Sequence, residues 1–449
     1  MALVEEREID ILRNALGVLQ EGFGHLPEFS ADVDYTKIQR VLLLAAERMR
    51  DNYPYHHPRY AGQMLKPPHP VARLAYALSL WINPNNHALD GGRASSAMET
   101  ESVAEIGRMF GYQAPLGHLC GGGTMANLEA LWVAGRLHPG KAILASAQAH
   151  YTHSRITDVL ALDYEAVPVR SDGRMDLAAL EARLNLGGVG TVVVTLGTTG
   201  LGAVDPLPEI LKLRERYGFR IHADAAYGGY FKLARRLEAD AGTAFSRTSE
   251  VDSIVIDPHK HGLQPYGCGC VLFRDSSVGS LYKHDSPYTY FSSAELHLGE
   301  ISLECSRPGA AAVALWATQQ LLPMSPGGEF ACGLDSSILA ARELWGRLKK
   351  SRRFRTLMAP QLDIVVFAVD GADAQHASRN ARTLFEAAAK ENLHLALTEL
   401  PADIVAHYWP ALELNRDTLT CVRSCLMKAE HLHWIDDIFS TLESAGLDQ

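Results

Sequence analysis

The 449-residue sequence lacks the long hydrophobic runs and the basic clusters that mark membrane-spanning and nucleic-acid-binding proteins. Its longest apolar runs, such as 41–46, are far shorter than the roughly 20 residues needed to cross a bilayer. The formal net charge is −10 and the sequence has no block of lysine or arginine, so we expect neither nucleic acid nor a membrane as partner. The acidic start lacks the positive region of a signal peptide, which predicts a cytoplasmic protein.

Cysteine is scarce and follows no disulfide framework. The seven cysteines are an odd number without regular spacing, which suits a reducing compartment. Two pairs, Cys268 with Cys270 and Cys421 with Cys425, could hold a metal ion, but no second pair of ligands follows at zinc-site spacing. We therefore expect buried free thiols and no metal site.

The chain is long enough, and apolar enough, for more than one structural unit. Its length exceeds what one hydrophobic core usually holds, and 47% hydrophobic with 21% charged residues is typical of a globular protein. Apolar residues at helical spacing predict an amphipathic helix over 35–50, and a proline-rich connection follows over 53–70. We expect residues 1–60 to form a helical arm.

Beyond this arm, short apolar runs alternate with helix-like segments. Strands are predicted at 142–145, 191–195, 219–222, 253–256 and 270–273, and helices at 177–184 and 207–217. Strands that are apolar throughout and alternate with helices indicate an α/β domain, in which a mostly parallel sheet is covered by helices. A helix over 309–321 and the prolines after it end this large domain, 61–322. Strand candidates at 362–369 and 418–422 predict a small α+β domain over 323–449.

Five motifs with distinctive chemistry follow one another between residues 119 and 260. They are Gly121-Gly122-Gly123-Thr124, Gln148-Ala-His150, Gly197-Thr198-Thr199, His222-Ala-Asp224-Ala-Ala226 and Asp257-Pro-His259-Lys260. Most lie at predicted strand ends, where open α/β sheets bind their ligands. Lys260 offers an amine for a Schiff base, and Asp224 offers a carboxylate that keeps a pyridine nitrogen protonated. This pair is what pyridoxal 5′-phosphate (PLP) requires.

Taken together, the motifs resemble those of the group II PLP-dependent amino-acid decarboxylases. The stretch 252–275 is especially similar to the archaeal-type tyrosine/aspartate decarboxylase branch, and the resemblance extends from about His57 to the C-terminus. It implies a fold type I PLP-dependent transferase fold, PLP as cofactor, and a homodimer that converts an acidic or aromatic L-amino acid to its amine and CO2. A carbon–carbon lyase or an aminotransferase would use the same cofactor. A catalytically silent PLP-fold binding protein is the alternative from another class.

The resemblance places the phosphate of PLP at the glycine-rich turn. Gly122, Gly123 and Thr124 open a predicted helix, whose N–H groups and dipole favour an anion. The alternative for these glycines is a tight turn without a ligand. Thr198 is a further expected cofactor contact, and His259 is expected beside the phosphate and the substrate.

The same resemblance places His150, Asp224 and Ala226 around the pyridine ring. His150 would lie flat on the ring, Ala226 would pack under it, and Asp224 would pair with its nitrogen. The alternatives are an ordinary core histidine and a helix-capping aspartate. His153 lies close to His150 in sequence, but no third ligand accompanies the two histidines, so we predict no metal there.

Further residues are expected to act on the substrate. The resemblance implies a mobile loop around Tyr288 and Tyr290, one of which, or else His150, would protonate the carbanion after CO2 leaves. His57 and Arg307 are predicted substrate contacts, with a structural ion pair as the alternative for Arg307. The side-chain class is left open by two candidate sets: His56, His57 and Arg59 for an acidic side chain, or Tyr60 and Tyr266 for an aromatic one.

Overall fold

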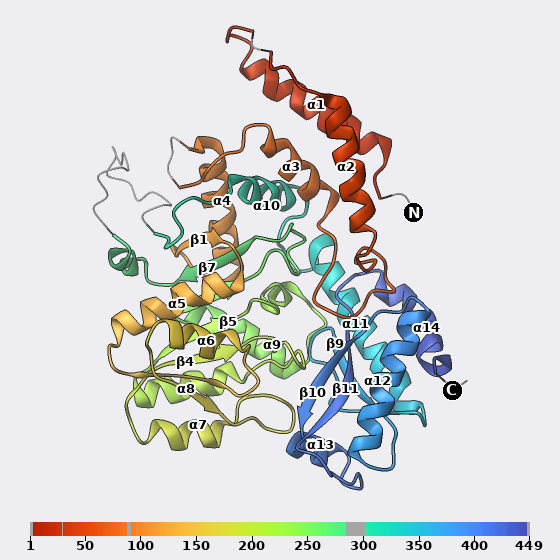
Figure 1. Ribbon diagram of the computed structural model, residues 1–449. Coiled ribbons are helices and arrows are strands. Elements are labelled where there is room, and N and C mark those ends of the chain that lie inside the picture. Colours follow the sequence, from red (N-terminus) through yellow and green to blue (C-terminus); the bar gives the residue numbers. More distant parts are fainter. Residues whose placement is uncertain (1–2, 29, 88–90, 284–300, 447–449) are drawn as a thin grey trace.

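The computed structural model describes residues 3–28, 30–87, 91–283 and 301–446 of the chain. Within these ranges the chain forms a larger domain, a smaller C-terminal domain and a pair of N-terminal helices at the outside of the molecule (Figure 1). None of the helices in these ranges is both long and apolar enough to cross a membrane.

A seven-stranded sheet lies at the centre of the larger domain. Its strands are β1 (Leu116–Cys120), β2 (Ala142–Ser146), β3 (Tyr164–Val167), β4 (Val189–Thr195), β5 (Arg220–Asp224), β6 (Ser253–Ile256) and β7 (Gly269–Phe273). The spatial order is β1-β7-β6-β5-β4-β2-β3. β7 is antiparallel to both of its neighbours, and the other pairs are parallel. This arrangement confirms the predicted mostly parallel sheet.

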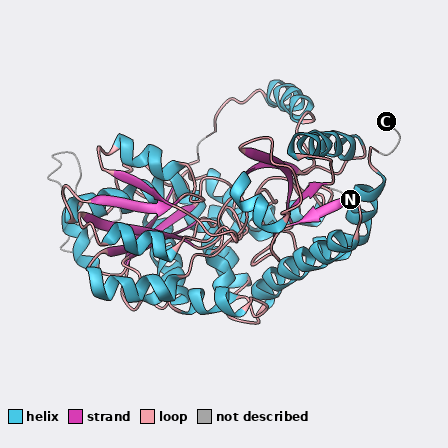
Figure 2. Ribbon diagram, turned by 90° about the horizontal axis from the view of Figure 1, so that it is seen from below, coloured by secondary structure: helices cyan, strands magenta, loops and turns pink. Residues whose placement is uncertain are grey.

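Helices lie on both faces of this sheet (Figure 2). They are α3 (Pro70–Leu80), α4 (Arg93–Phe110), α5 (Gly123–Leu137), α6 (Thr152–Val159), α7 (Leu177–Leu184), α8 (Leu207–Tyr217), α9 (Ala239–Ser246) and α10 (Gly309–Leu321), with the 3-10 helices η1 (Gly229–Leu233), η2 (Thr248–Glu250) and η3 (Ser276–Leu281). Because both faces are covered, strands such as β4 are buried along their whole length. Their valine-rich sequences suit that environment.

The smaller domain contains a four-stranded antiparallel sheet with helices against it. Its strands are β8 (Phe354–Thr356), β9 (Ile364–Val369), β10 (Ala396–Pro401) and β11 (Thr418–Cys425), in the order β10-β11-β9-β8. Its helices are α11 (Glu329–Lys350), α12 (Ala374–Lys390), α13 (Ala402–Tyr408) and α14 (His431–Ser444). The predicted α+β character is confirmed, and the predicted domain boundary at residue 322 falls between α10 and α11.

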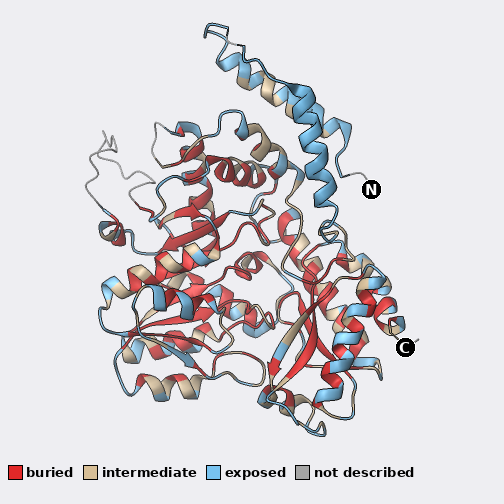
Figure 3. Cartoon of the chain, viewed as in Figure 1, coloured by how far each residue is buried: buried red, intermediate tan, exposed pale blue. Residues whose placement is uncertain are grey.

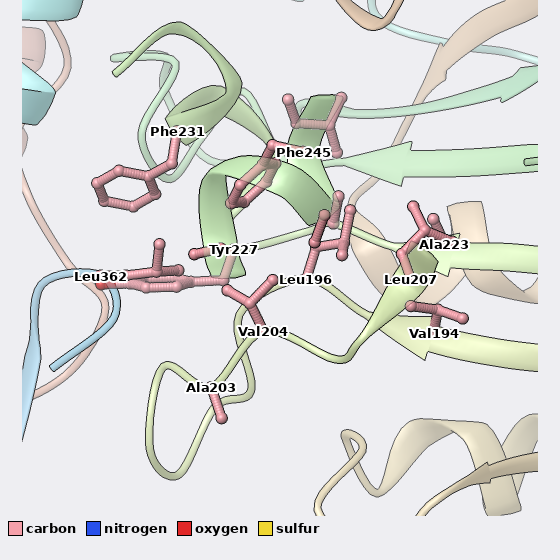
Figure 4. Close-up of a cluster of buried hydrophobic side chains, with 14 of the residues drawn as sticks. Val194, Leu196, Ala203, Val204, Leu207, Ala223, Tyr227, Phe231, Phe245 and Leu362 are labelled. Atoms are coloured by element: carbon pink, nitrogen blue, oxygen red, sulfur yellow. The ribbon is translucent and has the colours of Figure 1, made fainter. Parts of the chain in front are cut away.

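The two domains share one hydrophobic cluster. Leu362, which precedes β9, belongs to the same cluster as Tyr227 and Leu196, which follow β5 and β4 (Figure 4). Gly197 and Gly228 leave room for this contact, because a Cβ at either position would lie 2.9 or 3.2 Å from the Leu362 side chain. The turns that follow β4 and β5 are therefore packed from the small-domain side.

The N-terminal arm consists of α1 (Glu6–Gly22) and α2 (Tyr35–Met49), and neither helix contains a buried residue (Figure 3). The predicted helix over 35–50 corresponds to α2, whose first turn is capped by Asp34 through the Lys37 N–H. The apolar face of α2 is exposed along its length. A surface of this kind normally packs against another element.

Candidate active site

The predicted motifs meet at one edge of the larger sheet. β1, β2, β4, β5 and β6 run in the same direction, so the segments that follow them emerge side by side. A cavity of about 530 Å³ lies there. The predicted site residues that line it are Gly122, Gly123, Thr124, His150, Asp224, Ala226, His259 and Lys260.

Asp224, the last residue of β5, is a buried carboxylate with several hydrogen-bond donors. The nearest is His153 Nε2, 2.8 Å from Oδ2; the Ala226 N–H donates to Oδ1 at 3.1 Å, and the Asn127 side chain lies 3.4 Å from Oδ2. Burial by itself raises the pKa of Asp224, but His153, the Ala226 N–H and the charge of Lys260 together hold it well below its ordinary value. Asp224 is therefore ionised in the cavity.

A second layer of polar side chains lies behind Asp224. Burial lowers the pKa of His222 to about 3, so its imidazole is neutral. His222 Nε2 donates to Asn127 Oδ1 at 2.8 Å, and its Nδ1 lies 2.9 Å from Ser253 Oγ. These contacts turn the Asn127 amide nitrogen towards Asp224. Sequence patterns did not reveal the role of Asn127 or His153, because each acts through a residue distant in sequence.

Lys260 lies in the turn that follows β6. Its Nζ is 2.9 Å from Asp257 Oδ2, and the Lys260 N–H donates to the Asp257 carbonyl, so one residue holds both ends of the lysine. His259 is buried beside this pair, with Nε2 at 3.5 Å from the same carboxylate oxygen, and its ring packs against Tyr266. Burial lowers the pKa of His259. The amine therefore reaches the cavity from a fixed turn.

The glycine-rich turn begins α5 without a side-chain cap. Gly122 has φ 144°, a conformation that favours glycine, and a Cβ on Gly123 would lie 2.8 Å from Asp257 Oδ2. Larger residues would thus clash with the lysine turn. The uncapped N–H groups at the start of α5 line the cavity beside Thr124, which suits an anionic group.

His150 and Thr198 differ in how they meet the cavity. His150 lines it, and burial lowers its pKa, so the imidazole is neutral; Nδ1 lies 2.8 Å from Thr152 Oγ1. Thr198 instead turns its hydroxyl to the Ala203 N–H at 3.1 Å, and its neighbours Gly197 and Thr199 line the cavity. Thr198 thus stabilises the turn, and its two neighbours form the cavity lining.

The predicted substrate contacts lie apart from the cavity lining. The His57 ring packs against Trp434, 4.9 Å between centroids, and burial lowers its pKa. Arg307 is buried and donates to Glu99 and to the Leu119 carbonyl, both at 2.6 Å, which favours the ion-pair alternative. Tyr288 and Tyr290 lie outside the described residues.

A residue that the motifs did not reveal, Arg423 on β11, contacts a residue of the cavity lining from the small domain. Its guanidinium donates to the Thr199 carbonyl at 2.9 Å and to Gln63 Oε1 at 2.6 Å, while its Nε has no partner among the described residues. The side chain is nearly buried. An arginine on a strand of a separate domain gives no local sequence signal that it contacts this part of the larger domain.

The donors and acceptors of the cavity fit PLP. They comprise a lysine amine, an ionised carboxylate, a neutral imidazole and an uncapped helix start. Three buried polar atoms of residues that line the cavity, His259 Nδ1, Thr195 Oγ1 and Asp257 Oδ1, also have no partner among the described residues, as expected where a ligand completes the site.

Comparison with known proteins agrees with this chemistry. Residues 132–370 match the family model of the pyridoxal-dependent decarboxylase conserved domain. L-tyrosine decarboxylase of Enterococcus faecium is 28% identical over 72% of this chain and 69% of its own length. A probable L-tyrosine/L-aspartate decarboxylase of Methanothermobacter thermautotrophicus is 30% identical over 70% of this chain and 84% of its own length. The predicted similarity to this branch is confirmed.

Solved structures show the same fold. Mouse CSAD superposes with a TM-score of 0.79 at 22% identity, over 96% of this chain and 92% of that chain. Oryza sativa TDC, solved with PLP and tryptamine, gives 0.76 at 16% identity, over 98% and 96%. The predicted fold type I architecture is thereby confirmed, and the family match confirms PLP as the cofactor and amino-acid decarboxylation as the reaction. The chain belongs to the pyridoxal-dependent decarboxylase family.

Proposed function

We propose that this decarboxylase converts an aromatic L-amino acid to its amine and CO2, with an acidic amino acid as the alternative. The observation that carries the reaction is the single cavity shared by Lys260, ionised Asp224 and the uncapped start of α5. The family match favours this reaction over a carbon–carbon lyase, an aminotransferase or a silent binding protein. Both substrate classes occur in the names of the relatives, which include L-tyrosine and L-aspartate decarboxylases.

Each side chain of the cavity has a separate task in this proposal. PLP, when bound, supplies an aldehyde that condenses with amines and a ring that takes up the electron pair left when CO2 departs. Lys260 provides the amine that anchors the cofactor, and Asp257 holds that amine in place. Asp224 keeps the pyridine nitrogen protonated. His150 and Ala226 line the cavity where they can cover the ring faces.

The remaining tasks concern the phosphate and the proton returned to the substrate. The N–H groups of Gly123 and Thr124, at the positive end of α5, would hold the phosphate. His259, whose Nδ1 has no partner in the described part of the chain, lies beside them. The proton donor remains Tyr288, Tyr290 or His150, as the sequence predicts.

The small domain offers an anchor for the substrate carboxylate. Arg423 donates hydrogen bonds to Gln63 and to Thr199, which lines the cavity. Its Nε is unpaired among the described residues. A guanidinium binds a carboxylate through two parallel hydrogen bonds, which fixes the direction of the bond to be broken. We propose that Arg423 performs this role.

Replacing Arg423 by lysine is expected to lower kcat/KM on the order of a hundredfold, because a lysine keeps the charge but loses the two-pronged contact. Steady-state kinetics with the preferred amino acid measure this. The control is Arg382→Lys, an exposed arginine of the same domain that pairs with Glu399, which should leave kcat/KM unchanged. Wild-type kinetics in Arg423→Lys would remove Arg423 from the substrate site.

The surroundings of the cavity favour an aromatic side chain. Arg59, a candidate for an acidic side chain, is held by Asp437 at 2.6 Å and by the Glu391 carbonyl. Tyr266, a candidate for an aromatic one, lies against His259 with ring centroids 4.7 Å apart. Its exposed ring offers a surface on which a second aromatic ring can pack.

CO2 release measured with each of the twenty amino acids tests the substrate class. We expect the highest kcat/KM with tyrosine, phenylalanine or tryptophan. Release from aspartate or glutamate alone would establish the acidic alternative, and release from none of the twenty would contradict the proposed activity.

Tyr266→Ala should lower kcat/KM for the aromatic substrate while leaving the visible absorption of the bound cofactor intact.

We propose that two copies of the chain form the working unit. On α2 the apolar side chains of Ile38, Val41, Leu42, Leu43 and Leu44 are each at least 44% exposed, and a second copy is the natural cover for this apolar stretch. Sedimentation of the purified protein should give twice the mass of the chain, and Leu42→Glu with Leu43→Glu should shift it towards one copy. A wild-type protein that is active as a single copy would contradict this.

We also propose that the protein works in the cytoplasm. All seven cysteines are free, and five of them are buried. The two pairs considered as metal ligands, Cys268 with Cys270 and Cys421 with Cys425, are among the buried thiols, and burial raises the pKa of all four. Free thiols of this kind are typical of a reducing compartment.

A further inference from the structure

His153 is a fully buried histidine whose hydrogen bond is made to the cavity aspartate. It lies in α6, next to the start of that helix, with 0% of its surface exposed. Its Nε2 is 2.8 Å from Asp224 Oδ2, and its Nδ1 has no partner among the described residues. An ionised carboxylate only accepts hydrogen bonds, so Nε2 carries the proton and donates it.

The contacts of Asp224 are divided between its two oxygens. Oδ2 accepts hydrogen bonds from His153 at 2.8 Å and from Asn127 at the longer distance of 3.4 Å, whereas among the described residues Oδ1 accepts only the Ala226 N–H, at 3.1 Å. Oδ1 therefore has capacity for one more donor. The shortest hydrogen bond that stabilises the charged carboxylate is therefore the one from His153.

Burial opposes this charge. Burial is the largest influence on the pKa of Asp224 and raises it, and the hydrogen bond of His153 is the largest influence in the opposite direction. A carboxylate and a pyridine nitrogen that share one proton in a buried site can hold it on the nitrogen, as an ion pair, or on the carboxylate, as a neutral pair. Desolvation favours the neutral pair, and a hydrogen bond donated to the carboxylate favours the ion pair.

We propose that His153 is a positioning residue that keeps this shared proton on the pyridine nitrogen of the cofactor. The inference rests on the proposed pairing of Asp224 with that nitrogen. A protonated nitrogen draws electrons from the bound substrate far better than a neutral one, so His153 sets the strength of the electron sink without touching cofactor or substrate. The more distant His222 acts only through Asn127 and contributes less.

The proton can be located directly in the full chain freed of its own cofactor. The probe is 4-deoxypyridoxine 5′-phosphate with a ¹⁵N-labelled ring, which lacks the aldehyde and so cannot attach to Lys260. The ¹⁵N chemical shift of the bound probe reports whether the nitrogen carries the proton, and a titration gives the affinity. In the wild-type protein we expect a protonated nitrogen.

In His153→Phe the nitrogen signal should move towards the neutral form, and the affinity should fall about tenfold to a hundredfold, as for a lost hydrogen bond to a charged group. His153→Gln, which can still donate an amide N–H, should restore part of both. Thr157→Val is the matched control, since it removes a buried hydrogen bond to the His153 carbonyl in the same helix without touching Asp224. It should leave the nitrogen protonated.

The outcomes separate the inference from the function on which it rests. If Asp224→Asn loses the protonated nitrogen and His153→Phe keeps it with wild-type affinity, His153 is only a packing residue and the inference is overturned. If Asp224→Asn also keeps it, the proposed pairing of Asp224 fails as well. Should His153→Phe not fold, His153→Met provides the same comparison, and an unprotonated nitrogen in the wild-type protein contradicts the inference outright.

Discussion

Replacing Lys260 by alanine should abolish turnover and remove the visible absorption of the bound cofactor. Lys260 Nζ is the amine that lines the cavity, and without it the cofactor loses both its covalent anchor and the group that releases product. Absorption spectra and CO2 release of the purified variant measure the two losses. The expected fall in kcat exceeds about a thousandfold, as for loss of a catalytic nucleophile.

Lys260→Arg is the matched control for this variant. It keeps the positive charge beside Asp257, which lies 2.9 Å from the lysine, but a guanidinium does not condense with an aldehyde under these conditions. It should therefore fold as the wild type does and be as inactive as Lys260→Ala. Substantial turnover in either variant would show that another amine anchors the cofactor.

Asp224→Asn should lower kcat about a hundredfold to a thousandfold while the cofactor stays attached to Lys260. An amide at this position cannot balance a protonated pyridine nitrogen, so the ring becomes a poor electron acceptor. KM should change little, because Asp224 does not contact the substrate in this account. Steady-state kinetics and the visible spectrum together report both results.

Asp205→Asn separates this effect from the general cost of altering a buried carboxylate. Asp205 is buried near the end of the adjacent strand, where it accepts the N–H groups of Thr195 and Met175, both at 2.8 Å. Burial raises the pKa of Asp205 to about 6, so the amide replaces a carboxyl group whose ionisation is already disfavoured. We expect a lower thermal stability but a kcat within about threefold of the wild type, since surface and structural changes rarely reach the chemistry. An equal loss of kcat in both variants would refute the specific role of Asp224.

Much of the fold could be predicted because its elements have strong local patterns. The predicted helices 177–184, 207–217 and 309–321 coincide with α7, α8 and α10, and the predicted strand 253–256 coincides with β6. At the start of α7, Asp176 accepts two N–H groups, the kind of cap that fixes a helix end. Continuous apolar strands between such helices left few alternatives to a covered sheet.

Other elements gave no such pattern. β1 contains the polar residue His118, whose Nε2 lies 2.9 Å from Glu129 of α5, so its sequence does not form an apolar run. β3 is an edge strand of only four residues, two of them exposed, so it is too short and too little buried to give a clear pattern. The antiparallel direction of β7 was also not predictable, because an apolar run carries no direction.

The site shows the same division. Residues within short motifs, such as Lys260 and Asp224, were identified from the sequence and line one cavity. His153 was considered only as a metal ligand, and Arg423 was not identified, because their partners lie 71 and 224 residues away. Arg307 was predicted either to contact substrate or to form a structural ion pair, and the structure pairs it with the buried Glu99. The sequence could not decide between these roles, because Glu99 lies far away along the chain.

Borohydride reduction followed by peptide mapping tests the central claim most directly, because it converts the link between cofactor and protein into a stable bond. Burial lowers the pKa of Lys66 to about 8 and that of Lys428 to about 7, so these two amines are the strongest competitors for the aldehyde. Both lie in another cavity, away from Asp224. We expect the reduced adduct on Lys260; an adduct on Lys66, Lys428 or any other lysine would contradict the proposed site.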